Sequence, residues 1–158
     1  MLGENVSHKP QIAKEVLNRG HEVCSHAYTH TNYYLYKDTI PRELLNENIK
    51  KGLAAIQKEI GIVPRYVRIP HGYYRKWISE VARENNVDVV HWSFGCDWQN
   101  MTEEQMIQGY MKALKPGAIF LFHDGGGKRA KTKAILPIII SQVQQQGYAI
   151  VPLQELLK

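Results

Sequence analysis

The sequence predicts an α/β protein built around parallel strands. Segments with helical and strand-like patterns alternate about five times along the chain, as in folds where each strand is followed by a helix. The strand-like segments are short runs of apolar and β-branched residues, a pattern typical of strands that helices cover on both faces. A parallel sheet or barrel is therefore expected.

The helical segments are recognised by apolar residues at helical spacing and by their end signals. Pro41 lies in the first turn of the longest segment, which Asp38 or Thr39 can cap. Thr102 and Gln105 form a capping-box pattern at the start of another. The predicted helices are residues 10–19, 39–61, 76–85, 102–114 and 133–146.

The strand-like segments lie between these helices and are bounded by glycine, proline and polar turns. No internal repeat, linker or second domain is visible, so residues 1–158 are predicted to form a single domain. The predicted strands are HEVCSH at residues 21–26, RYVRI at 65–69, VDVVHWSF at 87–94, AIFLF at 118–122 and YAIVPL at 148–153.

Composition and charge argue against several classes of protein. The formal net charge is +5, and part of it is concentrated in residues 128–133, after a triple glycine. A solvated basic loop and a contact with an anionic polymer both fit this segment, but no finger spacing, RNA-binding signature or phosphate-loop spacing supports a nucleic-acid partner. No apolar run has the length of a signal peptide or a membrane span, and the 2 cysteines are too few for a disulfide framework. The sequence predicts no membrane span and indicates no localisation.

Polar residues gather where the predicted strands end. In parallel α/β folds the carboxyl ends of the strands meet at one edge and carry the reactive groups. A candidate site is therefore expected at this edge. The residues at the strand ends are Ser25, His26, Tyr28, Thr29 and His30, then Arg68, Pro70, His71 and Gly72, then Asp97 and Trp98, and finally His123 and Asp124.

The histidines are the strongest candidates within this set. His26 and His30 stand four apart and can converge on one metal ion, although a chance pair of structural histidines fits the same spacing. The zinc motif H-E-x-x-H is excluded, because HEVCS has Ser25 where its second histidine belongs. His123 follows a strongly apolar strand and can act as a general acid or base. Arg68 can equally be a plain salt-bridge partner.

The same segments carry a family resemblance. GHEVCSHAYTH resembles the zinc motif H-[ST]-x-x-H, VRIPHGYY the motif R-x-P-[YF], CDWQN an Asp-Trp motif, and IFLFHD the motif L-x-H. In this order, and over essentially the whole chain, they resemble the polysaccharide deacetylase family. This is the NodB-homology domain of carbohydrate esterases that remove N-acetyl groups from chitin and peptidoglycan sugars.

The resemblance implies a role for each matching residue. His26 and His30 would ligate a divalent metal, most readily zinc, and His123 would be the general acid that protonates the leaving amine. Arg68 and Asp97 would form a polar pair that orients the catalytic base. The matches on the substrate side are Trp98 as a wall of the sugar groove, Leu121 in the acetyl pocket, and His71, Gly72 and Tyr73 beside the oxyanion pocket.

The chain departs from the family pattern in ways that affect its expected activity. The family's zinc aspartate and general base come from a T-F-D-D motif, and none of the 15 acidic residues here is followed by a second aspartate. Residues 1–6, MLGENV, resemble the end of the family's next strand, so an N-terminally incomplete domain is expected. Ala27 replaces a hydroxyl residue and His71 an aromatic one. Weak zinc binding and impaired deacetylation are therefore expected.

The predicted fold is accordingly a distorted, N-terminally incomplete (β/α) barrel with about five parallel strands. The leading function is metal-dependent removal of N-acetyl groups from a peptidoglycan-type or chitin-type glycan, and the alternative is a non-catalytic glycan- or metal-binding remnant. A basic nucleic-acid binder is a weaker third hypothesis. An open barrel edge between residues 21–26 and 148–153 favours a homo-oligomer. Members of the family are commonly secreted or associated with the cell envelope.

Overall fold

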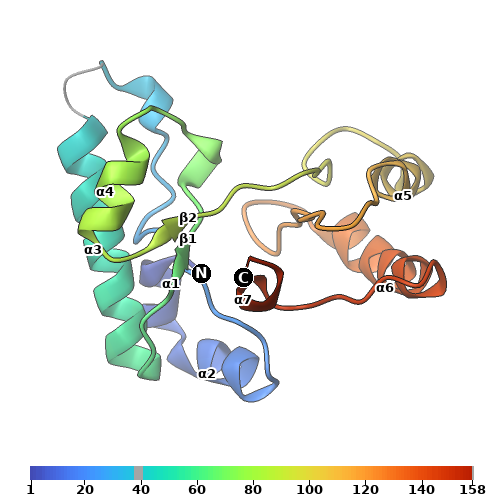
Figure 1. The fold of residues 1–158 in the computed structure, drawn as a ribbon, viewed down its shortest axis with the longest axis horizontal. Helices are drawn as coiled ribbons and strands as arrows, with labels where there is room; N and C mark the ends of the chain where they lie inside the picture. Colours follow the sequence, from blue (N-terminus) through green and yellow to red (C-terminus); the bar gives the residue numbers. More distant parts are fainter. Residues whose placement is uncertain (38–40, 158) are drawn as a thin grey trace. The chain divides into compact units, whose positions relative to one another are not determined.

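The computed structural model describes residues 1–37 and 41–157. The chain divides into two compact units, Met1–His91 in blue to green and Trp92–Lys158 in yellow to red in Figure 1. Each unit has its own buried cluster and is described by itself. The predicted single domain stays a prediction.

The first unit is centred on short parallel strands. β1 (Tyr66–Val67) pairs with β2 (Asp88–Val89). β1 also meets Ser25, whose N–H donates to the Tyr66 carbonyl at 2.9 Å and whose carbonyl accepts from the Arg68 N–H at 2.9 Å. Of the predicted strand HEVCSH, Ser25 alone pairs in this way among the described residues.

Helices pack around these strands. The longest, α3, contacts α1, α2 and α4. The predicted helices at 10–19 and 76–85 are confirmed, and the one at 39–61 is confirmed over Pro41–Ile60, while the proposed caps Asp38 and Thr39 lie outside the described residues. The helices are α1 (Gly3–His8), α2 (Pro10–Asn18), α3 (Pro41–Ile60) and α4 (Ile78–Glu84), with short 3-10 turns η1 (Tyr33–Leu35) and η2 (Pro70–Gly72).

The start of the chain differs from the expectation. Residues 1–6 were expected as the end of a strand, and Met1 fits this expectation, because its carbonyl accepts from the His26 N–H at 2.7 Å. Residues from Gly3 onward instead form α1. A Cβ on Gly3 would lie 2.9 Å from the Cα of Gly52 in α3, so glycine at position 3 lets α1 lie directly against α3.

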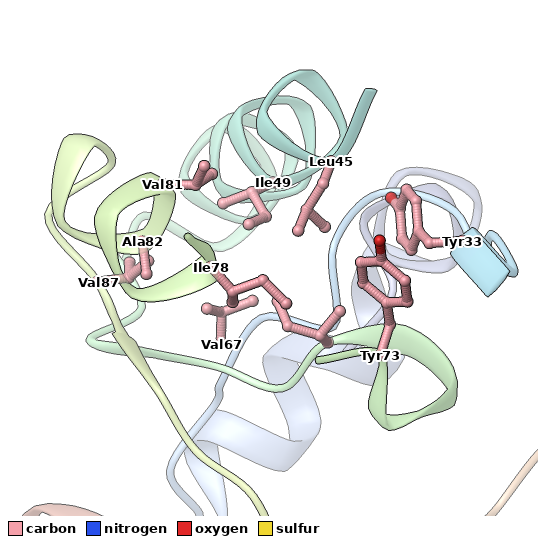
Figure 2. Packing of buried hydrophobic residues seen from close by; sticks show 10 residues of the cluster. Tyr33, Leu45, Ile49, Val67, Tyr73, Ile78, Val81, Ala82 and Val87 are labelled. Carbon is pink, nitrogen blue, oxygen red and sulfur yellow. The ribbon is translucent and has the colours of Figure 1, made fainter. Parts of the chain in front are cut away.

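The main core of the first unit lies between α3, α4 and the strands. Its apolar residues recur at helical spacing along both helices, as the sequence predicts. Figure 2 shows this cluster, with Tyr33 and Tyr73 at one end, so the core anchors η1 and the residue after η2. Other buried members are Leu45, Ile49, Val67, Ile78 and Val81.

The second unit is built mainly from helices. The Thr102 hydroxyl accepts from the Gln105 N–H at 3.2 Å, and Gln105 Oε1 accepts from the Thr102 N–H at 2.9 Å, which confirms the predicted capping box. Its core forms between the two longer helices and buries Met106, Tyr110, Ile135, Ile139 and Val143. The helices are α5 (Glu103–Lys112), α6 (Ala130–Gln145) and α7 (Leu153–Leu156).

Strand pairing in the second unit is limited. Phe94 and Phe120 form one parallel bridge, within the predicted strands 87–94 and 118–122. The predicted strand YAIVPL is wrong, because residues 148–152 form no ladder with the described residues and Ile150 is 59% exposed. An apolar run becomes a strand only where a neighbouring backbone pairs with it. Leu153 begins α7 instead.

The described residues thus form β1 and β2, with further single pairings at Ser25 and between Phe94 and Phe120. The alternation of helices with parallel pairings agrees with the predicted α/β class, and the count of about five strands is not confirmed. Within the described residues no helix has the length and apolar character needed to cross a bilayer. The homo-oligomer stays a prediction.

Candidate functional site

His26 follows Ser25 beside β1 and is held by the backbone of the neighbouring segment. Its Nδ1 lies 2.6 Å from the carbonyl oxygen of Arg68, the residue after β1. Because a carbonyl oxygen only accepts, Nδ1 carries the hydrogen and Nε2 keeps its lone pair. A neutral imidazole fixed in this way is a common arrangement for a histidine that ligates a metal.

Burial keeps His26 neutral. The residue is 9% exposed, and this burial, followed by the positive charge of Arg68, lowers the pKa of His26 from 6.5 to about 3. The imidazole is therefore uncharged at neutral pH, which is the form that binds a metal ion.

His30 and His71 extend the imidazole cluster. The ring centroids of His26 and His30 are 5.0 Å apart, and those of His30 and His71 are 4.4 Å apart. His71 has φ 57° and Ala27 has φ 64°, both in the left-handed region that costs free energy for a residue with a Cβ. These are the two positions where the sequence departs from the family's residue types. Surrounding packing holds both in strained conformations beside the histidine pair.

Asn48 of α3 fixes the loop between the two histidines. Its Oδ1 accepts from the N–H groups of Tyr28 at 3.0 Å and Thr29 at 2.9 Å, and its Nδ2 donates to the Thr29 carbonyl at 3.0 Å. Nδ2 also donates to the Tyr33 hydroxyl. Sequence reasoning missed Asn48, and its one local signal is an asparagine, a weak helix former, inside a long helix.

The residues expected beside the oxyanion pocket have different environments. His71 is exposed, and the carbonyl of Gly72 accepts from the Tyr34 hydroxyl at 3.3 Å. Tyr73 is 1% exposed and its ring belongs to the core. The roles of His71, Gly72 and Tyr73 beside an oxyanion pocket stay predictions.

His123 in the second unit is held by a carboxylate. Asp97 accepts from the His123 backbone N–H at 2.7 Å, from its Nδ1–H at 2.8 Å, and from the Thr132 hydroxyl at 3.0 Å. The Asp97 side chain is 0% exposed, whereas that of His123 is 24% exposed. This arrangement fixes the ring with Nδ1 toward the carboxylate and leaves Nε2 as the nitrogen for proton transfer.

Trp98 and Leu121 lie near His123. The Trp98 and His123 rings meet edge to face at 5.3 Å, and Trp98 is 47% exposed. Gly95 permits this packing, because a Cβ there would lie 2.9 Å from both the Trp98 ring and the Leu121 Cβ. The hydroxyl of Tyr110 donates to the Leu121 carbonyl at 2.7 Å. Trp98, Leu121 and His123 are therefore positioned by one packed set of neighbours.

The cysteines take no part in these groups as thiolates. Burial, followed by the negative charge of Glu22, raises the pKa of Cys24 from 9.0 to about 11. Burial also raises the pKa of Cys96. Both are free thiols, which stay protonated near neutral pH and are poor nucleophiles and metal ligands in that form.

The predicted site residues thus fall into two groups. His26, His30, Arg68 and His71 belong to the first unit, and Asp97, Trp98, Leu121 and His123 to the second. The Arg68–Asp97 pair would join the units and stays a prediction. Over residues 1–37 and 41–157, no cluster of three His, Cys, Asp or Glu side chains is arranged to hold a metal. The metal-ligand role of His26 and His30 stays a prediction.

Comparison with solved structures defines the class of protein. A wild-type CE4 family pseudoenzyme from Bacillus anthracis is similar to the chain with a TM-score of 0.86 and 25% identity, over 99% of this chain and 53% of that one. The chain therefore spans about half the length of that structure and has the fold of CE4 carbohydrate esterases.

The sequence comparisons then identify the family. The family model for polysaccharide deacetylase matches residues 1–90. The chain is 34% identical to a peptidoglycan-N-acetylglucosamine deacetylase of Bacillus cereus, over 100% of this chain and 73% of that protein. It is 27% identical to a chitooligosaccharide deacetylase of Bradyrhizobium sp., over 99% of this chain and 75% of that protein. The chain belongs to the polysaccharide deacetylase family, which confirms the resemblance seen in the motifs.

Proposed function

We propose that this chain takes part in the metal-dependent removal of N-acetyl groups from an amino-sugar polysaccharide of the peptidoglycan or chitin type. The observation that carries the proposal is the different partner of each key histidine. Nδ1 of His26 faces a backbone carbonyl, and Nδ1 of His123 faces a buried carboxylate. Metal-dependent amide hydrolysis uses both a site for a Lewis acid and a proton donor for the leaving nitrogen.

Each residue has a specific task in this proposal. His26 and His30 would hold the metal through their imidazoles, of which burial keeps that of His26 neutral, and a bound zinc ion would supply Lewis acidity to the amide carbonyl and to water. His123 gives a proton from Nε2 to the departing sugar amine, while Asp97 holds its Nδ1–H. The remaining assignments are Arg68 as the partner that orients the base, Trp98 as a groove wall and Leu121 as part of the acetyl pocket.

The proposed turnover of this chain is low. None of its acidic residues is followed by the second aspartate that the family motif requires, so a positioned base and a third zinc ligand are missing from its sequence motifs. Loss of a general base costs about 10²- to 10⁴-fold in rate. The similarity to a pseudoenzyme of the same fold favours a second candidate, a glycan- or metal-binding protein without turnover.

Zinc analysis tests the metal part of the proposal. The chain is dialysed against dilute zinc, and the bound metal is compared in the parent, in a His26→Ala/His30→Ala variant, and in a matched His8→Ala/His21→Ala control whose sites are exposed. We expect weak, partial binding that the first variant loses and the control keeps. Tight stoichiometric zinc in the His26→Ala/His30→Ala variant would contradict the assignment.

Acetate release from N-acetylglucosamine oligomers separates the two candidate functions. Slow release that zinc increases and that His123→Ala abolishes supports a deacetylase. Glycan binding without any release supports the binding protein. Robust release that persists in His123→Ala would overturn the role given to His123.

A further inference from the structure

The basic segment at residues 128–133 contains the start of α6, and Arg129 within it bonds to the protein's own backbone. Its Nε donates to the Gly125 carbonyl at 2.8 Å, and its Nη1 donates to the Asp97 carbonyl at 3.4 Å. Gly125 follows His123 in the sequence after a single intervening residue. The Arg129 guanidinium therefore joins the backbone beside the histidine to the backbone of the aspartate that holds it.

Thr132 lies in the first turn of α6 and contacts the side chain of the same aspartate. Asp97 Oδ2 accepts from the Thr132 hydroxyl at 3.0 Å and from the His123 backbone N–H at 2.7 Å, while Oδ1 accepts from the His123 Nδ1–H at 2.8 Å. Two of these three donors belong to His123 itself, whereas Thr132 belongs to a helix. The Thr132 hydroxyl therefore fixes the carboxylate to an element outside the histidine's own loop.

α6 is a rigid support for this hydroxyl. Thr132 is 6% exposed, and Ile135 and Ile139, which follow it at helical spacing, are buried in the core that α6 shares with α5. Lys131 Nζ also donates to the Met101 carbonyl at 2.7 Å, just before α5 begins. A displacement of the Thr132 hydroxyl would therefore have to disturb the packing of the helix.

The orientation of the carboxylate selects the nitrogen of His123 that carries the hydrogen. The two oxygens of a carboxylate are chemically equivalent, so only their partners distinguish them. With Oδ2 bonded to the Thr132 hydroxyl and to a backbone N–H, Oδ1 faces Nδ1 and favours the Nδ1–H tautomer of the neutral ring. Nε2 is then the nitrogen that can exchange a proton with a bound molecule.

We infer that Thr132 is a positioning residue for His123, and that Arg129 fixes the backbone on which this positioning depends. The Thr132 hydroxyl holds Asp97 in the orientation that keeps the hydrogen of the imidazole on Nδ1. The inference rests on the proposed function for the role of His123 in proton transfer. Its consequence for the tautomer of the ring is measured without turnover.

Nitrogen-15 NMR of the whole chain tests the inference. Spectra of the histidine side chains distinguish the two tautomers in mildly alkaline buffer, in which a histidine is ordinarily neutral, and a His123→Gln variant identifies the His123 signals. We expect the Nδ1–H tautomer in the parent and in Thr132→Ser, which keeps the hydroxyl. In Thr132→Val, which keeps the shape, the ratio of the Nδ1–H to the Nε2–H tautomer should fall about tenfold, because a hydrogen bond to a charged group is lost.

A second variant tests the backbone contacts and does not alter the buried core. Arg129→Ala should lower the same ratio by about threefold, because the backbone on each side of the Asp97–His123 pair loses a donor. The matched charge control is Lys128→Ala, an exposed neighbour of the same charge. The matched hydroxyl control is Ser141→Ala, exposed on the same helix. Both controls should keep the tautomer ratio of the parent.

The outcomes separate a positioning role from a structural one and from the proposed function. Lower stability in urea with the parent's tautomer ratio in Thr132→Val would overturn the inference, whatever acetate release is measured. If Thr132→Val does not fold, the parent's ratio in Arg129→Ala would overturn it in the same way. A lowered ratio in these variants, with no acetate release by the parent chain, leaves the inference standing and removes the hydrolytic proposal.

Discussion

The two units hold their key histidines in opposite ways. In the first unit, His26 donates Nδ1–H to the backbone carbonyl of Arg68 and is buried, with its pKa lowered to about 3. In the second, His123 donates Nδ1–H to the Asp97 carboxylate and keeps a side chain that is 24% exposed. The first environment keeps the His26 ring neutral, and the second orients the His123 ring through a buried carboxylate.

This difference in the Nδ1 partner supports the different tasks proposed for the two histidines. It also predicts which substitutions disturb the key histidine of each unit. The partner of His123 is one side chain, so a single substitution removes it. The partner of His26 is backbone, so only the packing and loop contacts around it can be changed by mutation. The following predictions test this asymmetry, from the largest expected effect to the smallest.

Removing the Asp97 carboxylate should have the largest effect on stability. Asp97→Ala leaves two N–H groups of His123 and the buried Thr132 hydroxyl without their acceptor. We expect a loss of about 3–5 kcal/mol in the free energy of unfolding, measured by urea denaturation. The exposed Asp124→Ala is the control and should stay within about 0.5 kcal/mol of the parent. A similar small change in Asp97→Ala would contradict a structural role for this carboxylate.

Acid should destabilise the first unit through His26. Because its folded-state pKa lies below the unfolded value, the stability that depends on neutral His26 is fully present above pH 6.5 and is lost as the pH falls toward 3. We expect His26→Gln to flatten the pH dependence of unfolding by roughly 4 kcal/mol between pH 6.5 and 3, since each pH unit contributes up to about 1.4 kcal/mol. His21→Gln is the control, and parallel curves for the parent and His26→Gln would refute the prediction.

Removing the contacts of the histidine loop, residues 27–29 between His26 and His30, should have a smaller effect on stability. Asn48→Ala removes the hydrogen bonds to Tyr28, Thr29 and Tyr33, with an expected cost of about 2 kcal/mol and about a tenfold loss of zinc affinity. The control is Asn46→Ala in the same helix, whose side chain accepts from Asn85 at 2.7 Å and leaves the loop untouched. Equal zinc affinity in the Asn48→Ala variant and in the control would show that the loop contacts do not position the ligands.

The smallest effect on stability should come from adding a methyl group at Gly95 in the second unit. Gly95→Ala places a Cβ 2.9 Å from the Trp98 ring and from Leu121 Cβ, with an expected cost of about 1–2 kcal/mol and a changed Trp98 environment. Urea denaturation measures the loss of stability, and tryptophan fluorescence measures the change in the Trp98 environment. Gly125→Ala is the control, because nothing lies within 4 Å of its added Cβ. An unchanged emission spectrum in Gly95→Ala would show that the neighbours adjust freely.

Several features could be predicted from the sequence because they depend on neighbouring residues alone. The helix from Pro41 to Ile60 follows from local apolar spacing, and the capping box of Thr102 and Gln105 from a three-residue interval. The order of the short motifs, including the pair His26 and His30, was enough to indicate the family that the comparisons then showed. Strand pairing was predicted less accurately, because it depends on a neighbouring backbone that local sequence does not specify. The run at residues 148–152 is apolar but has no ladder in the described structure.

The sequence by itself therefore determined the longer helices, the family and the candidate histidines, since these depend on local patterns. The tertiary structure decided which contacts each candidate residue makes. Arg68 lies 42 positions from His26, and Asp97 lies 26 positions from His123. No local pattern links residues at such intervals, and the same holds for Asn48 and the histidine loop. Folding brings a carbonyl to one ring and a carboxylate to the other, and those contacts set the orientation of both imidazole rings.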